Sequence, residues 1–271
     1  MFLRITNLWL ALGLAGIAGI LTLLASTSSV MAEGSRIRVA LYVDRGASAP
    51  AKKAFKALLD RSDRIDWKSV EGDDIANGVL KDFDILLVPG GSAAKESKSM
   101  GKESREAVRR FVENGGAYMG VCAGAYLSSQ AKENDLGLLP IDTLDKEHWY
   151  RVNDGTPVDV ELTPAGMEVF GVQKSRVRIV YENGPIFGAP EGKTDESFTP
   201  LGYFRSEVVA DGGKRGVMLG APAMIFSRYG KGEVLALSPH PEKTAGLRFM
   251  ILRALTWLYE HQQRIPFEKR Q

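Results

Sequence analysis

The stretch that decides the fold is Gly115-Gly116-Ala117-Tyr118-Met119-Gly120-Val121-Cys122-Ala123-Gly124. Its apolar run, 117–121, has the composition of a β-strand that is buried on both faces. The run is followed at once by a cysteine with glycine two positions before it and two after it, and such glycines permit the sharp, strained turn of a nucleophile elbow. The pattern therefore predicts a buried strand, a tight turn that carries Cys122, and a helix.

The residues before this stretch alternate short apolar runs with amphipathic segments. Strands are predicted over 37–43, 67–70, 83–88 and 117–121, and helices over 51–59, 75–80 and 102–113. Because the connections are short, this βαβα succession predicts an α/β fold with a doubly wound parallel sheet.

After residue 130 the predicted elements are mostly short strands separated by turn residues. The expected strands are 149–162, 176–181, 199–204, 217–219 and a hairpin of 224–229 with 233–238; helical segments are expected over 165–170 and 245–261. We therefore expect an antiparallel β insertion in the parallel sheet, and a last helix that packs back on the sheet.

The composition excludes several classes of protein. The 271 residues include 35 basic and 33 acidic residues and carry a formal charge of +2, so no polycationic surface for nucleic acid is expected. A single cysteine closes no intramolecular disulfide, and three histidines provide few ligands for a zinc site. Neither a metal site nor a cofactor is predicted.

The first 32 residues are interpreted as a cleaved export signal. One basic residue, Arg4, precedes an uncharged run over 8–25, and small residues lie at the positions that a signal peptidase reads before residue 33. The alternative is an uncleaved N-terminal anchor, since about 18 uncharged residues approach the length of a membrane span. Either interpretation predicts an exported protein, periplasmic or secreted, whose single domain is 33–271, and membrane association only if the segment is not cut.

A second group of chemistry-bearing residues follows the strand predicted near 233–238. His240 lies in Ser238-Pro239-His240-Pro241-Glu242, at the carboxyl end of a strand, where open α/β sheets bind their ligands. Glu242 is close enough in sequence to orient the imidazole, as the third member of a catalytic triad does. A solvated surface loop is the alternative for an isolated motif of this kind.

The turn Val88-Pro89-Gly90-Gly91-Ser92 ends another predicted central strand. We expect the backbone amides of Gly91 and Ala123 to form an oxyanion hole beside Cys122. Gly90, Tyr126 and Asn183 are candidate substrate-binding residues; for Asn183 a simple turn, and for Tyr126 core packing, are the alternatives. For Cys122 itself the alternative is a buried apolar filler.

Four segments resemble the biotin-protein ligase N-terminal-like domain, a family of the class I glutamine amidotransferase-like superfamily. They are 88–91, 115–126, Val180-Tyr181-Glu182-Asn183-Gly184-Pro185 and 237–242. The resemblance implies a flavodoxin-like fold and a Cys-His-Glu triad, which falls here on Cys122, His240 and Glu242. Glutamine amidotransferases resemble this chain at the elbow but usually carry a glutamine shortly after it, where this chain has Ala125-Tyr126.

Two hypotheses for the function follow. The first is an exported cysteine-dependent amide or ester hydrolase, or acyl transferase, in which Cys122 attacks a carbonyl of a small-molecule or peptide-like substrate. The second is a domain of the same fold that binds a ligand without turning it over, or that senses oxidants through Cys122. The sequence leaves the substrate and the oligomeric state open.

Overall fold

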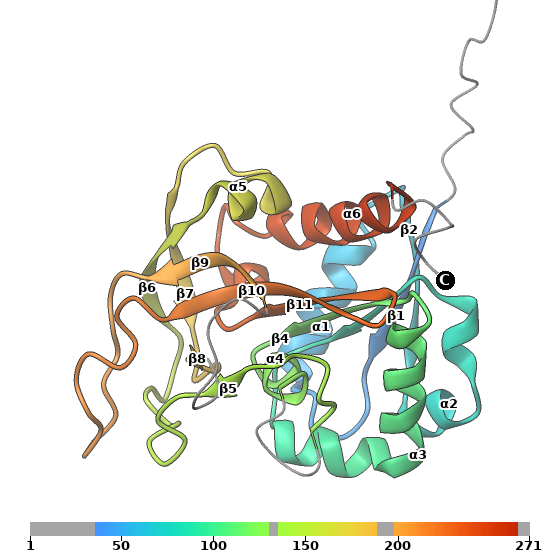
Figure 1. The fold of residues 1–271 in the computed structure, drawn as a ribbon, viewed down its shortest axis with the longest axis horizontal. Helices are drawn as coiled ribbons and strands as arrows, with labels where there is room; N and C mark the ends of the chain where they lie inside the picture. The colour runs from blue at the N-terminus through green and yellow to red at the C-terminus, as the bar shows by residue number, and fades with distance from the viewer. Residues whose placement is uncertain (1–35, 130–134, 189–197, 265–271) are drawn as a thin grey trace, which may run out of the picture. The chain divides into compact units, whose positions relative to one another are not determined.

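A nine-stranded mixed sheet forms the centre of the computed structural model, which describes residues 36–129, 135–188 and 198–264 (Figure 1). The strand order is β2-β1-β3-β4-β11-β10-β9-β6-β7. The parallel strands are β1 (Ile37–Tyr42), β2 (Ile65–Val70), β3 (Ile85–Val88), β4 (Ala117–Val121) and β11 (Gly232–Leu237). The remaining strands of this sheet are antiparallel: β6 (Thr156–Leu162), β7 (Arg176–Tyr181), β9 (Thr199–Phe204) and β10 (Pro222–Tyr229).

The predicted doubly wound α/β fold is confirmed, and the antiparallel strands extend the same sheet through the hairpin of β10 and β11. A separate pair, β5 (Asp142–Thr143) and β8 (Phe187–Gly188), was not expected from the sequence. Each is only two residues long, which leaves no periodicity to detect.

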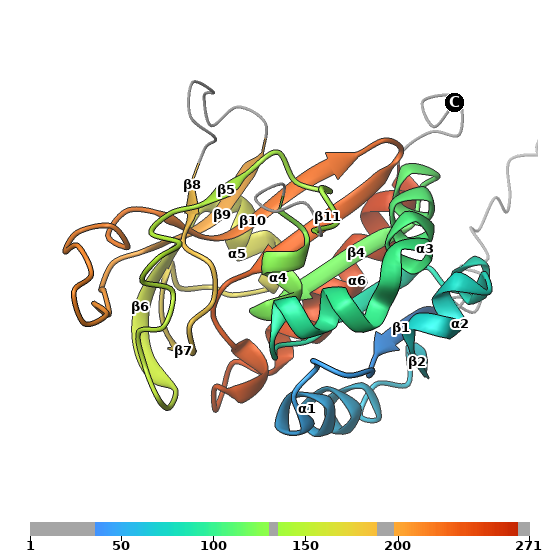
Figure 2. The same ribbon diagram turned by 90° about the horizontal axis from the view of Figure 1, so that it is seen from below.

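Helices cover both faces of the sheet (Figures 1 and 2). One face carries α1 (Ala49–Leu59), α5 (Pro164–Phe170) and α6 (Phe249–Arg264); the other carries α2 (Gly72–Ala76), the short 3₁₀ helix η1 (Val79–Asp82), α3 (Ala93–Glu113) and α4 (Ala123–Leu127). A second 3₁₀ turn, η3 (Pro241–Lys243), precedes α6. Two separate apolar cores result, one on each side of the sheet.

The amphipathic patterns explain these helices. In α6 the residues Met250, Ile251, Ala254, Leu255 and Leu258 form one fully buried stripe. In α5 the side chain of Thr163 accepts a hydrogen bond from the amide of Gly166 and caps the helix, as its position before Pro164 predicts.

Several predicted boundaries were wrong. The segment 217–219 is not a strand, because Gly216 (φ 84°) and Gly220 (φ 78°) turn the backbone into the left-handed region on both sides of it. The strand predicted over 149–162 begins only at Thr156. Helix α3 starts at Ala93 rather than at 102, and Gly101 (φ 71°) kinks it. The residues before 102 have only a weak amphipathic pattern, and burial of Met100 in the core outweighs it.

The described residues contain no helix that is long and apolar enough to cross a membrane. The export signal expected in residues 1–32 lies outside them and stays a prediction, as does the domain boundary at residue 33.

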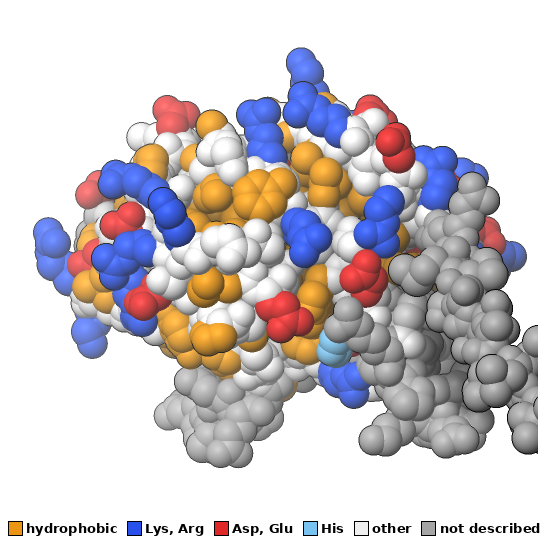
Figure 3. All heavy atoms as spheres, turned by 90° about the horizontal axis from the view of Figure 1, so that it is seen from above, with side chains coloured by type: hydrophobic (Ala, Val, Ile, Leu, Met, Phe, Trp, Pro, Cys, Tyr) orange, Lys and Arg blue, Asp and Glu red, His pale blue; other side chains and the backbone are white. Residues whose placement is uncertain are grey.

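On the face of α5 and α6, acidic and basic side chains are intermixed (Figure 3).

Candidate active site

Cys122 occupies the turn between β4 and α4 with a backbone that non-glycine residues rarely adopt, φ 53° and ψ −102°. Its amide donates to the carbonyl of Leu237 at 2.8 Å, and its carbonyl accepts from the amide of Tyr126 at 3.0 Å. Neighbouring strand and helix therefore hold a conformation that costs about 1–3 kcal/mol. Strain of this kind is typical of a nucleophile elbow.

The flanking glycines are required by close backbone contacts. A Cβ on Gly120 would collide with the backbone of Gly124, and a Cβ on Gly124 would collide with the carbonyl of Val88. The hydroxyl of Tyr118, which is fully buried, donates to the carbonyl of Gly124 at 2.7 Å and closes the elbow from the other side of the strand. The turn expected from the glycine spacing is thus present.

His240 lies beside Cys122 because β11 pairs in parallel with β4. The register sets Leu237 opposite Val121, so both chains leave the sheet at the same edge. The amide of His240 donates to the carbonyl of Val180 at 2.7 Å, and Thr244 donates through its hydroxyl to the carbonyl of His240 at 2.8 Å. These bonds fix the backbone on both sides of the imidazole.

The imidazole of His240 donates through Nδ1 to Oε1 of Glu242, at 2.6 Å. Their side chains are only 2% and 0% exposed. Burial by itself lowers the pKa of His240, but attraction to Glu242 and to Cys122, with the hydrogen bond to Glu242, outweighs it and raises that pKa to about 10. The ring is therefore positively charged at neutral pH.

The turn after β3 lies on the other side of this pair. A Cβ on Gly90 would be 3.0 Å from Cε1 of His240 and 3.3 Å from Cβ of Cys122, so only a glycine leaves both side chains undisturbed. Gly90 thus lines the site through its backbone. The amides of Gly91 and Ala123 donate no hydrogen bond to any group recorded in the described part of the chain. Both amides thus remain available as donors, which the predicted oxyanion hole requires.

Glu182, which the sequence analysis did not single out, contacts the histidine and the cysteine. Its carbonyl accepts a hydrogen bond from Sγ of Cys122 at 3.4 Å, and its Oε2 lies 4.0 Å from Nε2 of His240. The same carboxylate is paired with Lys243. No local sequence signal places β7 next to the end of β11; the bridge between Val180 and His240 does so.

The turn residue Asn183 holds this segment in place. Its side-chain oxygen accepts from the amides of Arg151 (2.5 Å) and Val152 (2.9 Å), and its side-chain nitrogen donates to the carbonyl of Val152 at 2.8 Å. Its φ is 57°. Both the oxygen and the nitrogen of the side-chain amide bond to the backbone of residues 151 and 152, which favours the turn interpretation of Asn183 over the substrate-binding one.

Tyr126 lies one turn after Cys122 and presents a buried hydroxyl without a hydrogen-bond partner in the described residues. Burial is the main cause that raises its pKa, and the neighbouring groups that act on it include Tyr181, Cys122 and Arg151. The guanidinium of Arg151 is buried and paired with Asp145 at 2.7 Å. Tyr126 therefore faces a polar environment near the thiol, not a purely apolar core.

Within the described residues, buried polar atoms without a partner cluster here. They include Tyr126 Oη, Ser238 Oγ, His240 Nε2 and Glu242 Oε2. Such atoms are rare in folded proteins and often mark functional sites. The described residues hold no cluster of side chains suited to a metal ion.

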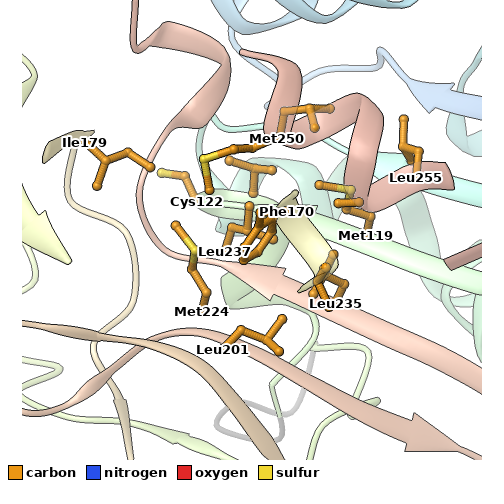
Figure 4. Close-up of a cluster of buried hydrophobic side chains, with 14 of the residues drawn as sticks. Met119, Cys122, Phe170, Ile179, Leu201, Met224, Leu235, Leu237, Met250 and Leu255 are labelled. Carbon is orange, nitrogen blue, oxygen red and sulfur yellow. The ribbon is translucent and has the colours of Figure 1, made fainter. Parts of the chain in front are cut away.

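The thiol also borders the core. Cys122 belongs to the apolar cluster of the α6 face, which includes Ile179, Leu237 and Met250 (Figure 4). Two cavities, of about 430 and 620 Å³, lie elsewhere, one near the start of β3 and the other near α1. At the elbow itself Cys122 is 7% exposed.

Comparison with known proteins identifies the first half of the domain. Residues 38–145 match the family described as "Biotin-protein ligase, N terminal". The match covers less than half of the chain. The match includes Gly91 and Cys122, whereas His240 and Glu242 lie beyond it.

Two groups of curated relatives are glutamine amidotransferase class I-like proteins. Pyridoxal 5'-phosphate synthase subunit PdxT of Halorubrum lacusprofundi is 26% identical over 161 residues, which are 49% of this chain and 81% of the relative. Phosphoribosylformylglycinamidine synthase subunit PurQ of Thermus thermophilus is 28% identical over 180 residues, 60% of this chain and 73% of the relative.

Solved structures confirm the fold. A chain of PurLQS from Thermotoga maritima aligns with a TM-score of 0.60 at 17% identity, covering 82% of this chain and 99% of that chain. A ThuA-like protein from Parabacteroides merdae aligns with a TM-score of 0.55 at 14% identity, covering 83% and 90%. The chain thus has a class I glutamine amidotransferase-like α/β fold.

Proposed function

We propose that the protein is a cysteine-dependent amide or ester hydrolase, or acyl transferase, of the glutamine amidotransferase-like type. The observation that carries the proposal is the meeting of Cys122, on its strained elbow, with the His240–Glu242 pair at one sheet edge. The similarity to the synthase subunits PdxT and PurQ supports an amidotransferase or hydrolase activity.

In the proposed reaction the sulfur of Cys122 attacks the carbonyl carbon, and the carbonyl π electrons move to oxygen. The amides of Gly91 and Ala123 stabilise the oxyanion. In the reactive pair the thiol proton already resides on His240, so the sulfur attacks as a thiolate; His240, oriented by Glu242, then gives that proton to the leaving nitrogen or oxygen as the acyl bond breaks. A water, or an acceptor amine or alcohol, then attacks the thioester carbonyl and gives its proton to the neutral His240; the carbonyl re-forms as the C–S bond breaks, and the thiolate of Cys122 and the protonated His240 are restored.

Mass spectrometry of intact protein tests this proposal. The mature chain is incubated with a panel of activated esters and amides, beside Cys122→Ala and His240→Gln. We expect an acyl adduct on Cys122 in the wild type, none in Cys122→Ala, and formation at least about 100-fold slower in His240→Gln. Acylation at equal rates in wild type and His240→Gln would show that the triad is not formed.

A non-catalytic ligand-binding or redox-sensing domain is the second candidate. It is favoured by the turn at Glu182, whose carbonyl holds the thiol while Cys122 is only 7% exposed. This candidate predicts a ligand that raises the melting temperature equally in wild type and Cys122→Ala, or a reversible sulfenic acid on Cys122 without acyl turnover. A burst of product from any ester or amide would exclude it.

We also propose that the protein acts outside the cytoplasm, on the basis of residues 1–32. Fractionation of the producing cell and the intact mass of the exported protein test this. A mass that begins near residue 33 supports cleavage, a full-length mass in the membrane fraction supports the anchor, and a cytoplasmic full-length chain contradicts both.

A further inference from the structure

Glu96, in the first turns of α3, is an acidic residue whose buried carboxyl group has no basic or hydrogen-bonding partner among the described residues. Its side chain is fully buried, 0% exposed, and neither carboxyl oxygen has a hydrogen-bond partner in the described residues. A buried carboxylate without partners is costly, because the charge loses its hydration. The residue has no evident role in folding.

Glu96 lies behind the turn that lines the proposed active site. A Cβ on Gly91 would be 2.9 Å from Oε1 of Glu96, whereas a Cβ on Gly90 would be 3.0 Å from Cε1 of His240. The two adjacent glycines thus face opposite ways. Only this turn separates the buried carboxyl from the imidazole and from Cys122.

The peptide between the two glycines has a defined orientation. The carbonyl of Gly90 accepts a hydrogen bond from the amide of Ser48 at 3.0 Å. In a trans peptide the N–H points opposite to the carbonyl, so the amide of Gly91 points away from Ser48. The amide of Gly91 thus donates to none of the described groups in this orientation.

The environment keeps Glu96 neutral at moderate pH, since burial raises its pKa to about 8. The titratable groups that interact with it from the sheet are Tyr42 of β1 and Tyr118 of β4, whose own pKa values burial raises above the usual range. Tyr42 also interacts with Asp44 and Glu71. His240 lies on the far side of the glycine turn. Both tyrosines therefore stay neutral while Glu96 titrates.

We propose that Glu96 is a positioning residue for the oxyanion hole: its neutral carboxyl leaves the Gly91 amide turned to the active site, and its ionised form draws that amide away. An ionised carboxylate needs a hydrogen-bond donor, and the unbonded Gly91 amide is adjacent to it in the turn. Glycine tolerates the rotation of the Gly90–Gly91 peptide, which breaks the bond to Ser48. This inference rests on the proposed acyl chemistry.

The test compares two reactions of Cys122 that differ in their need for an oxyanion hole. Acylation by an activated ester passes through an oxyanion, whereas alkylation by iodoacetamide does not. Both rates are measured for wild type, Glu96→Gln and the control Glu103→Gln, which changes an exposed carboxyl of the same helix. Between about pH 7 and about pH 9 the ratio of acylation to alkylation should fall about tenfold in the wild type and the control, since that range spans the ionisation of Glu96. In Glu96→Gln the ratio should stay constant.

The amide resonance of Gly91 in ¹⁵N NMR gives a readout without substrate. It should shift with a midpoint near pH 8 in the wild type, following the pKa of Glu96, and should not shift in Glu96→Gln. If the ratio of acylation to alkylation and the Gly91 amide resonance each show the same pH dependence in all three proteins, the inference is overturned, while the acylation of Cys122 still stands. Absence of acylation in the wild type at every pH would overturn the proposed function, and this inference with it.

Discussion

Nδ1 of His240 lies 2.6 Å from Oε1 of Glu242, and both side chains are almost completely excluded from water. The two residues are separated by one proline, so the pair is local in sequence, but its burial is not. The strand β7 covers it through the bridge between Val180 and His240. Because the pair is dry, its electrostatics affect the stability of the fold as well as the proposed chemistry.

The first prediction concerns stability and pH. The pKa of His240 is raised to about 10, so its charged form stabilises the folded state. That contribution is fully present below the unfolded pKa of about 6.5 and is lost as pH rises toward the folded value. Urea unfolding should show the advantage of wild type over His240→Gln falling by about 1 kcal/mol per pH unit between about pH 7 and about pH 10. A difference that is constant with pH would contradict a charged His240.

The second prediction contrasts the two glycines after β3. In Gly90→Ala the new methyl group pushes His240 and Cys122, so acylation should fall at least about tenfold while stability changes by about 1 kcal/mol. In Gly91→Ala the methyl group collides with the carbonyl of Gly46, and stability should fall by about 3 kcal/mol or more. Chemical unfolding and acylation kinetics of both variants check this. Equal stability losses would argue against the opposite orientations of the two residues.

The third prediction concerns the strain at Cys122. Its φ of 53° penalises any side chain, so Cys122→Gly should be more stable than Cys122→Ala by about 1 kcal/mol. Both variants remove the thiol, which makes them matched controls for its packing. Thermal unfolding gives the comparison. If Cys122→Ala is the more stable of the two, the elbow is not strained.

The fourth prediction concerns the turn that closes the site. Asn183→Ala removes three hydrogen bonds to residues 151 and 152 and should cost about 2–3 kcal/mol. Asn183→Gly loses the same bonds but accepts the φ of 57°, so it should be about 1 kcal/mol more stable than Asn183→Ala. In both variants Cys122 should react faster with iodoacetamide, because the carbonyl of Glu182 no longer holds the thiol. Unchanged labelling would show that the turn does not limit access.

Much of the fold was predictable because its signals are local. The strands 117–121, 176–181 and 199–204 were predicted with the bounds that the structure has, since each is a short apolar or alternating run between turn residues. The start of α3 and the absence of a strand at 217–219 were missed. There, packing of Met100 in one case and left-handed glycines in the other outweigh the local pattern.

By itself the sequence determined the pieces of the candidate site: a glycine-flanked Cys122, a His240 with Glu242 two residues away, and a glycine pair after a buried strand. Only the tertiary structure decided how they meet, because strand pairing between β4, β11 and β3 is a long-range choice that local periodicity does not encode. It also brought in Glu182 and Glu96, whose burial and charge depend on elements far away in the chain. Burial, which keeps Glu96 neutral, and the buried pairing with Glu242, which keeps His240 charged, are properties of the packed fold and not of any segment.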